Sequence, residues 1–193
     1  MGKITPAAFK GPTREDLLAS VTKKVPDVIA PGLNVLFCGI NPGLYSAWTG
    51  FHFARPGNRF WPALHAGGFT ERVLHPSENR ELLRLRLGIT NLVQRATAAA
   101  DELFAPELIS GRAILEKRLK RYRPRMLAVL GLTSFRTAFG ERHASIGLQS
   151  QKIHGALVWV LPNPSGLNAH FTPAALGQLF EELRRYTQNL CIK

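Results

Sequence analysis

The chain has 193 residues, of which 45% are hydrophobic and 20% charged, so it has the size and composition of one soluble globular domain. Its 25 Lys and Arg against 13 Asp and Glu give a formal net charge of +12, which favours a polyanionic partner, nucleic acid before an anionic membrane surface. No apolar run approaches the roughly 20 residues of a membrane span, and two cysteines are too few for a zinc or iron–sulfur site in one chain.

The first elements are expected after a loose basic leader that covers residues 1–12. Thr13 can cap a short helix because Asp16 follows three positions later, as in a capping box. The apolar run Leu33–Cys38 predicts a buried strand. The segment Gly39–Gly57 after it contains four glycines and two prolines, which predicts a long loop. Loops of this length inside a compact domain are usually functional.

The middle of the chain predicts two helices and a second strand. Asn58 can cap a helix over Arg59–Ala66, and a further helix is expected over Ser77–Leu87, with its first residue as cap. Gly88 is expected to end that helix. The short apolar run Ile89–Val93 then predicts a strand.

The remaining elements complete an alternation of strands and helices. A helix is expected over Pro106–Arg121, with a broad apolar face of Leu108, Ile109, Ile114, Leu115 and Leu119. Then follow a strand at Met126–Leu130, a helix at Thr133–Phe139, a strand at Ala156–Leu161 and a last helix at Thr172–Gln188. Four short strands that alternate with helices predict a three-layer α/β/α domain over residues 13–193, with a central, mostly parallel sheet of about four strands.

Several common chemistries lack their signatures in this sequence. Neither the glycine fingerprint of a dinucleotide-binding fold nor a phosphate-binding P-loop is present. Ser165 is not a hydrolase nucleophile of the G-x-S-x-G type, because Asn163 stands in place of the first glycine. The six histidines are scattered without metal-ligand spacing and are expected to be surface or hydrogen-bonded core residues. We therefore expect no metal and no cofactor.

Two polar loops carry the residues with the clearest chemical potential. Gly39–Gly43 follows the first predicted strand and Asn163–Leu167 follows the last. Ligands of an open parallel sheet bind beyond the carboxyl ends of its strands, so the two loops are expected to form opposite walls of one cleft. Asn41 cannot take a proton, but its amide can hold a water molecule in place. Such a residue suits a reaction whose leaving group departs almost unaided.

Five motifs in this order resemble those of the mismatch-specific uracil/thymine-DNA glycosylases, within the uracil-DNA glycosylase superfamily. They are Phe37–Leu44, Thr49–Ala54, Asn58–Trp61, Gly88–Val93 and Leu161–Leu167. The resemblance covers roughly Leu33 to Gln188. It implies a single α/β/α domain without metal or cofactor that hydrolyses the N-glycosidic bond of uracil or thymine opposite guanine.

By position, the resemblance implies a role for each residue of the base pocket. Asn41 would place the attacking water at the sugar C1′, and Phe53 would stack on the extruded pyrimidine, which is worth about 1–3 kcal/mol. Asn91 would hydrogen-bond the edge of the base. Gly43 stands where strictly uracil-specific relatives have a tyrosine, so the pocket would accept the thymine methyl group. Asn163 stands where those relatives have a catalytic histidine, so neutral donors would stabilise the departing base and turnover would be slow.

The same resemblance implies how the chain would hold DNA. Ile40 would contribute to the substrate pocket, and Leu167 would fill the gap that the extruded base leaves in the stack. Gly166, with its neighbours Ser165 and Asn168, would offer groups to the widowed guanine.

The sequence departs from the family pattern at two places. Ala169, followed by His170, replaces a common arginine, which affects how the opposite base is recognised. Gln94 replaces an acidic residue before Arg95, and Asp101 is the nearest downstream carboxylate that could substitute for it.

A run of basic residues is expected to be a solvated helix face, with the phosphate contacts at the rim of the cleft. Its members are Arg112, Lys117, Arg118, Lys120, Arg121, Arg123 and Arg125. Together these features predict a monomeric DNA repair glycosylase that is cytoplasmic, or nucleoid-associated in a bacterium, and not secreted. It would act by base flipping on uracil, and also on thymine or lesions such as ethenocytosine, opposite guanine in double-stranded DNA. Two alternatives stay open: a non-catalytic module that binds DNA mismatches or damage, and a small-molecule hydrolase with a basic surface.

Overall fold

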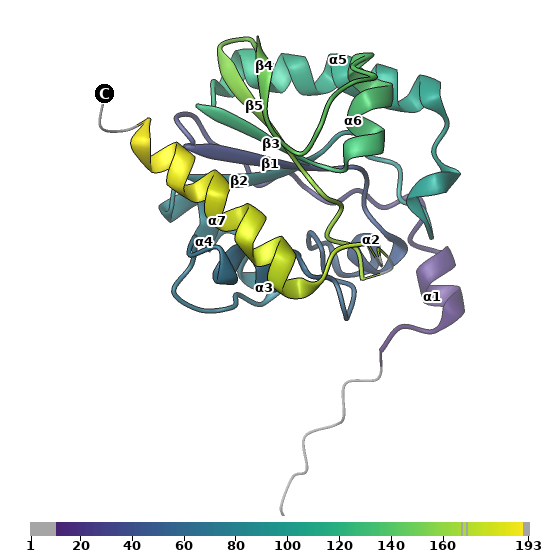
Figure 1. Cartoon of the computed structure of the whole chain (residues 1–193). Helices are drawn as coiled ribbons and strands as arrows, with labels where there is room; N and C mark the ends of the chain where they lie inside the picture. The colour runs from purple at the N-terminus through teal and green to yellow at the C-terminus, as the bar shows by residue number, and fades with distance from the viewer. Residues whose placement is uncertain (1–10, 167, 169, 191–193) are drawn as a thin grey trace, which may run out of the picture.

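Apolar strands form a central five-stranded sheet in the computed structural model, which describes residues 11–166, 168 and 170–190 (Figure 1). The order across the sheet is β2 (Leu87–Asn91), β1 (Val35–Gly39), β3 (Met126–Leu130), β5 (Ala156–Leu161) and β4 (Gly147–Ile153). The first four strands are parallel, and β4 is antiparallel to β5. The predicted α/β class and the four predicted strands are confirmed, apart from small shifts at the strand ends.

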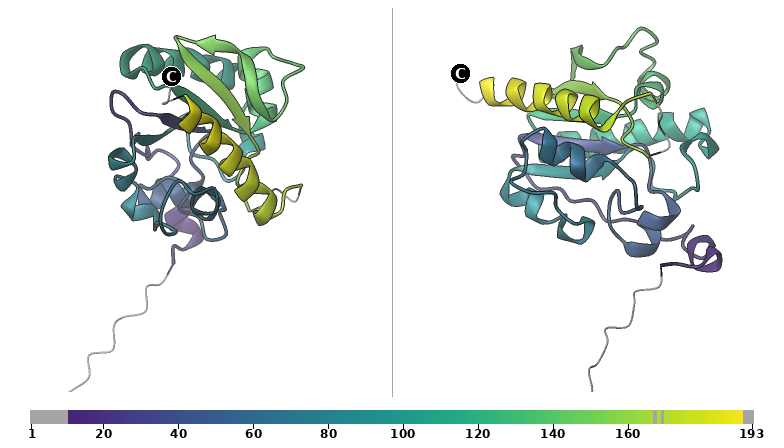
Figure 2. Two further views of the ribbon diagram at one scale, coloured as in Figure 1. Left: turned by 60° about the vertical axis from the view of Figure 1, so that its left-hand side comes forward. Right: turned by 60° about the horizontal axis from the view of Figure 1, so that its bottom comes forward.

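Helices cover both faces of the sheet (Figures 1 and 2). They are α1 (Arg14–Leu18), α2 (Leu44–Thr49), α3 (Phe60–Ala66), α4 (Glu81–Arg84), α5 (Ala105–Tyr122), α6 (Leu132–Phe139) and α7 (Pro173–Asn189). Two short 3-10 turns lie at Pro76–Glu78 and Ala100–Glu102. Because side chains alternate along a strand, each face of the sheet builds its own core. Phe37 packs with Phe60 of α3 and Phe180 of α7, whereas Leu36 faces the core beneath α5 and α6.

The expected helix over Ser77–Leu87 is wrong. The segment forms a 3-10 turn, which His75 caps through its ring nitrogen, and then the single turn α4. Gly88 does not end a helix but lies inside β2, where an added Cβ would come within 2.5 Å of Leu33 Cδ1 and 2.6 Å of Val28 O. The missing side chain therefore allows close packing against the chain that precedes β1.

Two further expectations need correction. The segment Gly39–Gly57 is not a loop throughout, since it contains α2, which starts after Gly43 and ends at Gly50. The apolar face of α5 is narrower than expected, because Ile109 and Ile114 are exposed. Gly111 lies on the buried face instead, where the helix approaches Leu92 so closely that a Cβ would come within 2.4 Å of its carbonyl oxygen.

The capping box at the start of α1 is confirmed, since Thr13 and Asp16 exchange backbone and side-chain hydrogen bonds. Residues 1–10 of the predicted leader lie outside the described residues. Among the described helices, none has both the length and the apolar character needed to cross a membrane.

Candidate active site at the carboxyl ends of the strands

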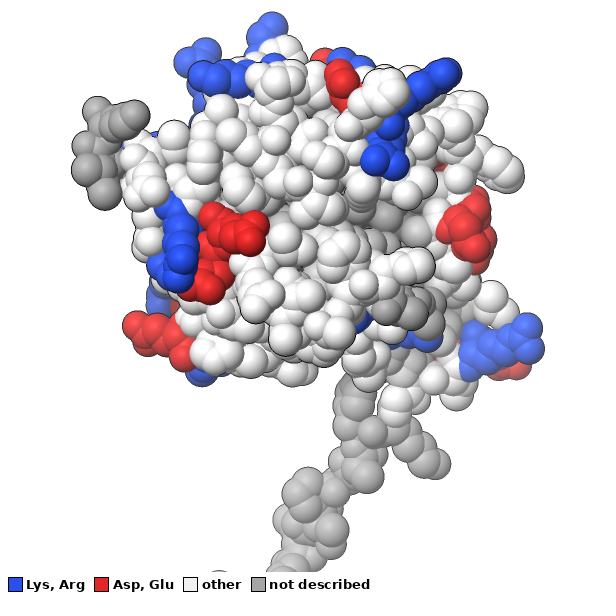
Figure 3. Space-filling view, in the orientation of Figure 1, with Lys and Arg blue, Asp and Glu red and all other residues white. Residues whose placement is uncertain are grey.

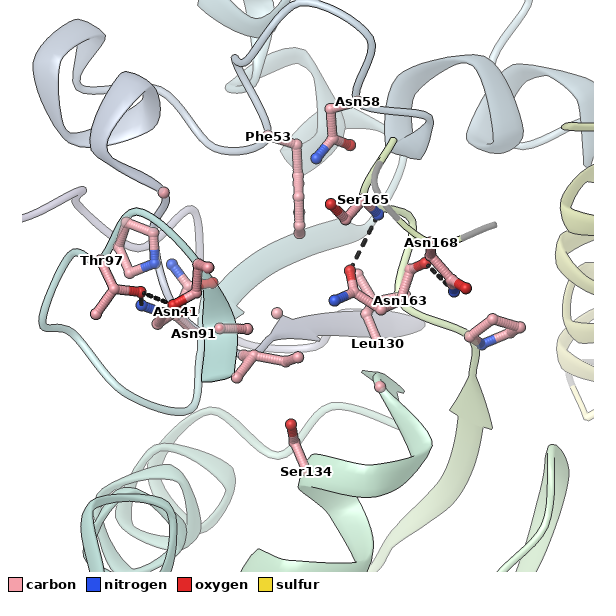
Figure 4. A pocket seen from close by; sticks show the side chains of 18 of the residues that line it. Asn41, Phe53, Asn58, Asn91, Thr97, Leu130, Ser134, Asn163, Ser165 and Asn168 are labelled. Atoms are coloured by element: carbon pink, nitrogen blue, oxygen red, sulfur yellow. Dashed lines mark hydrogen bonds between the residues drawn. The ribbon is translucent and has the colours of Figure 1, made fainter. Parts of the chain in front are cut away.

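A cavity of about 700 Å³ opens at the edge of the sheet where the four parallel strands end. The segments that follow β1, β2, β3 and β5 all contribute to its walls (Figure 4). This is the place where open parallel sheets bind ligands. Eight of the ten predicted site residues line this cavity together: Ile40, Asn41, Gly43, Phe53, Asn91, Asn163, Ser165 and Asn168.

The two other predicted DNA-binding residues, Gly166 and Leu167, are not among the described residues that line the cavity. Gly166 does not line the cavity but packs on Gly57, whose carbonyl oxygen would lie 2.6 Å from an added Cβ. Leu167 lies outside the described residues, so its role stays a prediction. The loop around it is held by its own side chains, since Ser165 N donates to Asn163 Oδ1 and Asn168 Nδ2 donates to Asn163 O, both at 3.0 Å.

The side-chain amide of Asn41 has a fixed orientation. Its nitrogen donates to Arg95 O at 2.9 Å and to Thr97 Oγ1 at 2.6 Å (Figure 4). Thr97 Oγ1 in turn donates to Ala99 O at 2.7 Å, so the hydroxyl must accept from Asn41. Both amide protons are thus engaged, and Oδ1 is left as the acceptor that Asn41 can offer to a ligand. A carbonyl oxygen held in this way can orient a water molecule.

The floor of the cavity combines an aromatic ring with a buried amide. Phe53 adopts a left-handed backbone conformation with φ of 54°, and its ring stacks on Phe60 at a centroid distance of 4.2 Å. Gly39 lies beneath both side chains, since a Cβ there would come within 2.4 Å of Asn91 Oδ1 and 3.1 Å of the Phe53 ring. The glycine thus allows the ring and the amide to sit together against the end of β1.

A buried histidine orients Asn91. His52 is only 2% exposed, and its Nε2 lies 2.9 Å from Pro26 O while its Nδ1 lies 3.4 Å from Asn91 Nδ2. Burial lowers the pKa of His52, so the neutral ring is favoured. A neutral ring that donates from Nε2 to a carbonyl can only accept at Nδ1, and this places the amide nitrogen of Asn91 toward His52.

Arg59 is an organising residue to which the sequence analysis gave no role, although it lies in the motif Asn58–Trp61 at the start of a predicted helix. Its guanidinium donates to three carbonyl oxygens of the segment 165–171, those of Ser165, Asn168 and Phe171, each at 2.5 Å. Its backbone N–H donates to Pro164 O at 2.9 Å. The start of α3 is thereby tied to the loop on the opposite side of the cavity. Contacts between residues more than 100 positions apart leave no local signal in a sequence.

Of the residues at the two departures named in the sequence analysis, Ala169 lies outside the described residues. Asp101 and His170 line the cavity as exposed residues, whereas Gln94 is not among the residues that line it. Arg95 pairs with Glu107 at 2.7 Å, and the resulting hydrogen bonds lower the pKa of Glu107 to about 2. This ion pair anchors Arg95, whose backbone carbonyl accepts a hydrogen bond from the side chain of Asn41.

The walls of the cavity carry little charge. Among its described lining residues, Arg55 is the only Lys or Arg and Asp101 the only carboxylate. No group of three His, Cys, Asp or Glu side chains in the described part of the chain is arranged to hold a metal ion. The site therefore offers amides, hydroxyls and an aromatic ring, groups that suit a neutral, planar, hydrogen-bonding ligand.

Comparison with known proteins agrees with this geometry. The sequence profile of the Uracil DNA glycosylase superfamily matches residues 26–184, which include all four segments that line the cavity. The fold is similar to the solution NMR structure of a proposed uracil DNA glycosylase from Methanosarcina acetivorans, with a TM-score of 0.54 and 19% sequence identity. The match covers 84% of this chain and 98% of that chain.

Proposed function

The chain belongs to the uracil DNA glycosylase superfamily, whose members are DNA glycosylases, and from this premise we propose that it releases uracil mispaired with guanine from double-stranded DNA. Thymine and related lesions such as ethenocytosine, opposite guanine, are the further substrates of the proposal. The observation that carries it is the orientation of the Asn41 amide, whose oxygen is available to a ligand in the cavity beyond the carboxyl ends of the parallel strands.

In the proposed reaction, Asn41 Oδ1 accepts a hydrogen bond from one water molecule and aims its oxygen at C1′ of the extruded nucleotide. The bond between C1′ and the base nitrogen breaks through an oxocarbenium-like state, and the base leaves with the bonding electrons. The water oxygen bonds to C1′, and its proton passes to solvent or to the departing base. Asn41 contributes position rather than proton transfer, because an amide does not titrate in this range.

Recognition of the base is assigned to Phe53 and Asn91. The ring of Phe53, backed by Phe60, would stack on the extruded pyrimidine. Asn91 directs one N–H toward His52, so its second N–H and its oxygen are the groups that would meet the O4 and N3–H edge of the base. Extrusion of a base costs a few kcal/mol, and the cost is lowest for a mispaired base. This difference favours release of a mismatched uracil.

Stabilisation of the departing base is assigned to Asn163. Its Oδ1 accepts from Ser165 N, so its amide nitrogen is left to donate, and Figure 4 draws this nitrogen on the cavity side. A donor aimed at the oxygen beside the breaking bond would stabilise the charge that develops there. A neutral amide supplies less stabilisation than a charged donor, so slow turnover is expected.

The breadth of the substrate range is assigned to Gly43. This residue lines the cavity, and no described atom lies within 4 Å of the position that its Cβ would occupy. The space is open to a substituent at C5 of the pyrimidine, such as the methyl group of thymine.

The proposal is tested with labelled duplexes that carry uracil, thymine or ethenocytosine opposite guanine, uracil opposite adenine, and single-stranded uracil DNA. Alkali cleaves the strand wherever a base has been released. We expect release of uracil opposite guanine by the native chain, at least about 100-fold slower release by Asn41→Ala, and native rates for Asn189→Ala at the exposed end of α7. Selective binding of mismatched duplexes without alkali-sensitive sites would identify a binding module instead. Near-native release by Asn41→Ala would overturn the proposed role of the amide.

A further inference from the structure

A group of exposed cations lies at the edge of the sheet opposite the cavity. Arg86 precedes β2, while Lys120, Arg121 and Arg123 lie at the end of α5, just before β3. Lys152 lies on β4, one residue before that strand ends. Figure 3 shows Lys and Arg side chains along the top of the molecule, over α5 and the β4–β5 hairpin. We call Arg86, Lys120, Arg121, Arg123 and Lys152 the distal basic surface.

Hydrogen bonds to backbone groups show that the elements of this surface adjoin one another. Arg86 donates from Nη2 to Gly32 O at 2.8 Å, and Gly32 N donates to Tyr122 O at 3.3 Å. These bonds bring Arg86 beside the end of α5. On the other side, Leu157 N donates to Arg125 O at 3.0 Å, and Leu157 is the partner of Lys152 in the sheet. The surface thus continues from β2 across the end of α5 to β4.

The nearby carboxylates are already engaged by other cations. Glu116 pairs with Arg112 at 2.7 Å, and Asp27 pairs with Arg118 at 2.8 Å. None of the ion pairs formed between described residues uses a member of the distal basic surface. Its positive charge is therefore not neutralised within the described part of the chain.

Helix stability explains only part of this arrangement. Lys120 and Arg121 interact favourably with the carboxyl end of α5. However, Arg86 and Lys152 lie on other elements. Arg86 and Arg123 also adopt left-handed backbone conformations, with φ of 57° and 48°, where glycine or asparagine would be less strained. A long cationic side chain occupies both of these strained positions.

We propose that the distal basic surface binds the phosphate backbone of a second double-stranded DNA segment. Rows of exposed Lys and Arg bind DNA by neutralising phosphates, without reading its sequence. The strands between the two edges have five or six residues, so the distal basic surface lies about 17–20 Å from the cavity. A straight duplex at the cavity cannot contact both edges. In this arrangement a first duplex lies at the cavity, and that point rests on the proposed function. Binding of DNA by the distal basic surface does not depend on the proposed function.

The test is a bridging assay with two short undamaged duplexes, one carrying biotin and the other a fluorophore. The native chain is expected to retain the fluorescent duplex on streptavidin at low salt. The variant K120Q/R121Q/K152Q is expected to retain about tenfold less of the fluorescent duplex. The slope of log retention against log salt concentration is expected to be shallower by about 2 to 3. The matched control is R14Q/R80Q/R142Q, which removes three exposed cations from other parts of the chain and is expected to behave as the native chain does.

Uracil release from a short duplex and circular dichroism are measured on the same three proteins, and both are expected to be unchanged. Equal bridging by the two variants, or no bridging by the native chain, would overturn the proposal. Binding of phosphatidylserine vesicles without DNA bridging would assign the surface to a membrane and would also overturn it. Because uracil release is measured separately, failure of the glycosylase proposal is distinguished from failure of this one.

Discussion

The amide of Asn41 and the hydroxyl of Thr97, 56 residues apart in the sequence, are joined by a hydrogen bond of 2.6 Å. Its direction is set by Thr97, which gives its own proton to Ala99 O. The bond therefore decides which end of the Asn41 amide is available to a ligand. Thr97 is 3% exposed, so water does not readily replace it.

Replacement of Thr97 by alanine is expected to slow uracil release without weakening DNA binding. Loss of one hydrogen bond of this kind costs about 0.5–1.5 kcal/mol, which corresponds to about 2- to 13-fold in the single-turnover rate. Thr97→Ser keeps the hydroxyl and serves as the matched control, with a rate close to native. Equal rates for the alanine and serine variants would show that the hydroxyl does not position Asn41.

Alanine at Gly39 and at Gly43 is expected to have opposite outcomes. The Cβ of Gly39→Ala would come within 2.4 Å of Asn91 Oδ1, whereas that of Gly43→Ala would meet no described atom within 4 Å. Gly39→Ala is therefore expected to displace Asn91, to slow release of uracil and to cost about 1–3 kcal/mol of stability. Gly43→Ala is expected to leave uracil release and the unfolding midpoint unchanged. Rates and urea unfolding curves of the pair check this contrast.

Tyrosine at Gly43 is expected to suppress release of thymine while leaving most of the release of uracil. Gly43 has an ordinary extended conformation, with φ of −71° and ψ of 159°, so a side chain is tolerated there. The ring would occupy the space assigned to the methyl group of thymine. Rates on G·T and G·U duplexes are compared, and an equal loss on both would contradict the steric explanation.

Most of the sheet could be predicted because buried parallel strands are continuous apolar runs. Val35–Gly39 and Met126–Leu130 are buried at every position, and such runs are visible in a sequence. Strand β4 was missed because Gly147–Ile153 is largely polar and only partly buried. It lies at the edge of the sheet and pairs with β5 alone. Gly88 was misinterpreted because its role depends on Leu33 and Val28, which are distant in the sequence.

The candidate site could be predicted only for residues of the quoted motifs, such as Asn41, Phe53, Asn91 and Asn163. Asn41 and Asn163 follow strands, so their meeting at one edge follows from the parallel topology. The roles of Thr97, His52 and Arg59 were not predicted, although His52 and Arg59 lie inside quoted motifs, because each acts through a hydrogen bond to a residue that only the fold brings near. Such hydrogen bonds depend on which residues are close in space, and a single sequence does not show which distant residues meet.

Replacement of Arg59 by lysine is expected to loosen the loop on the far side of the cavity. Lysine has one ammonium group, which cannot match the fork that donates to Ser165, Asn168 and Phe171. We expect a stability loss of about 1–3 kcal/mol and weaker retention of a duplex that contains an abasic site. Thermal unfolding and fluorescence anisotropy measure the two effects. Arg80→Lys at an exposed position is the control, and native product retention by Arg59→Lys would contradict a role in positioning the loop.

The burial of His52 predicts how the stability of the fold depends on pH. Burial lowers its pKa in the folded chain below the ordinary value of about 6.5, so below that pH the unfolded chain binds the proton more readily. The free energy of unfolding is therefore expected to fall as the pH drops below about 6.5, by at most about 1.4 kcal/mol per pH unit for this one proton. Protonation at Nδ1 would also remove the acceptor that Asn91 uses.

Urea unfolding of the native chain, His52→Gln and His143→Gln between pH 5 and pH 8 measures this effect. Glutamine does not titrate, so the free energy of unfolding of His52→Gln is expected to change less with pH than that of the native chain, even if it is lower at every pH. His143 is exposed, and its replacement is expected to keep the native pH dependence. If His52→Gln loses stability toward pH 5 as steeply as the native chain, the acid sensitivity arises elsewhere, and His52 is not the group that couples protonation to the orientation of Asn91.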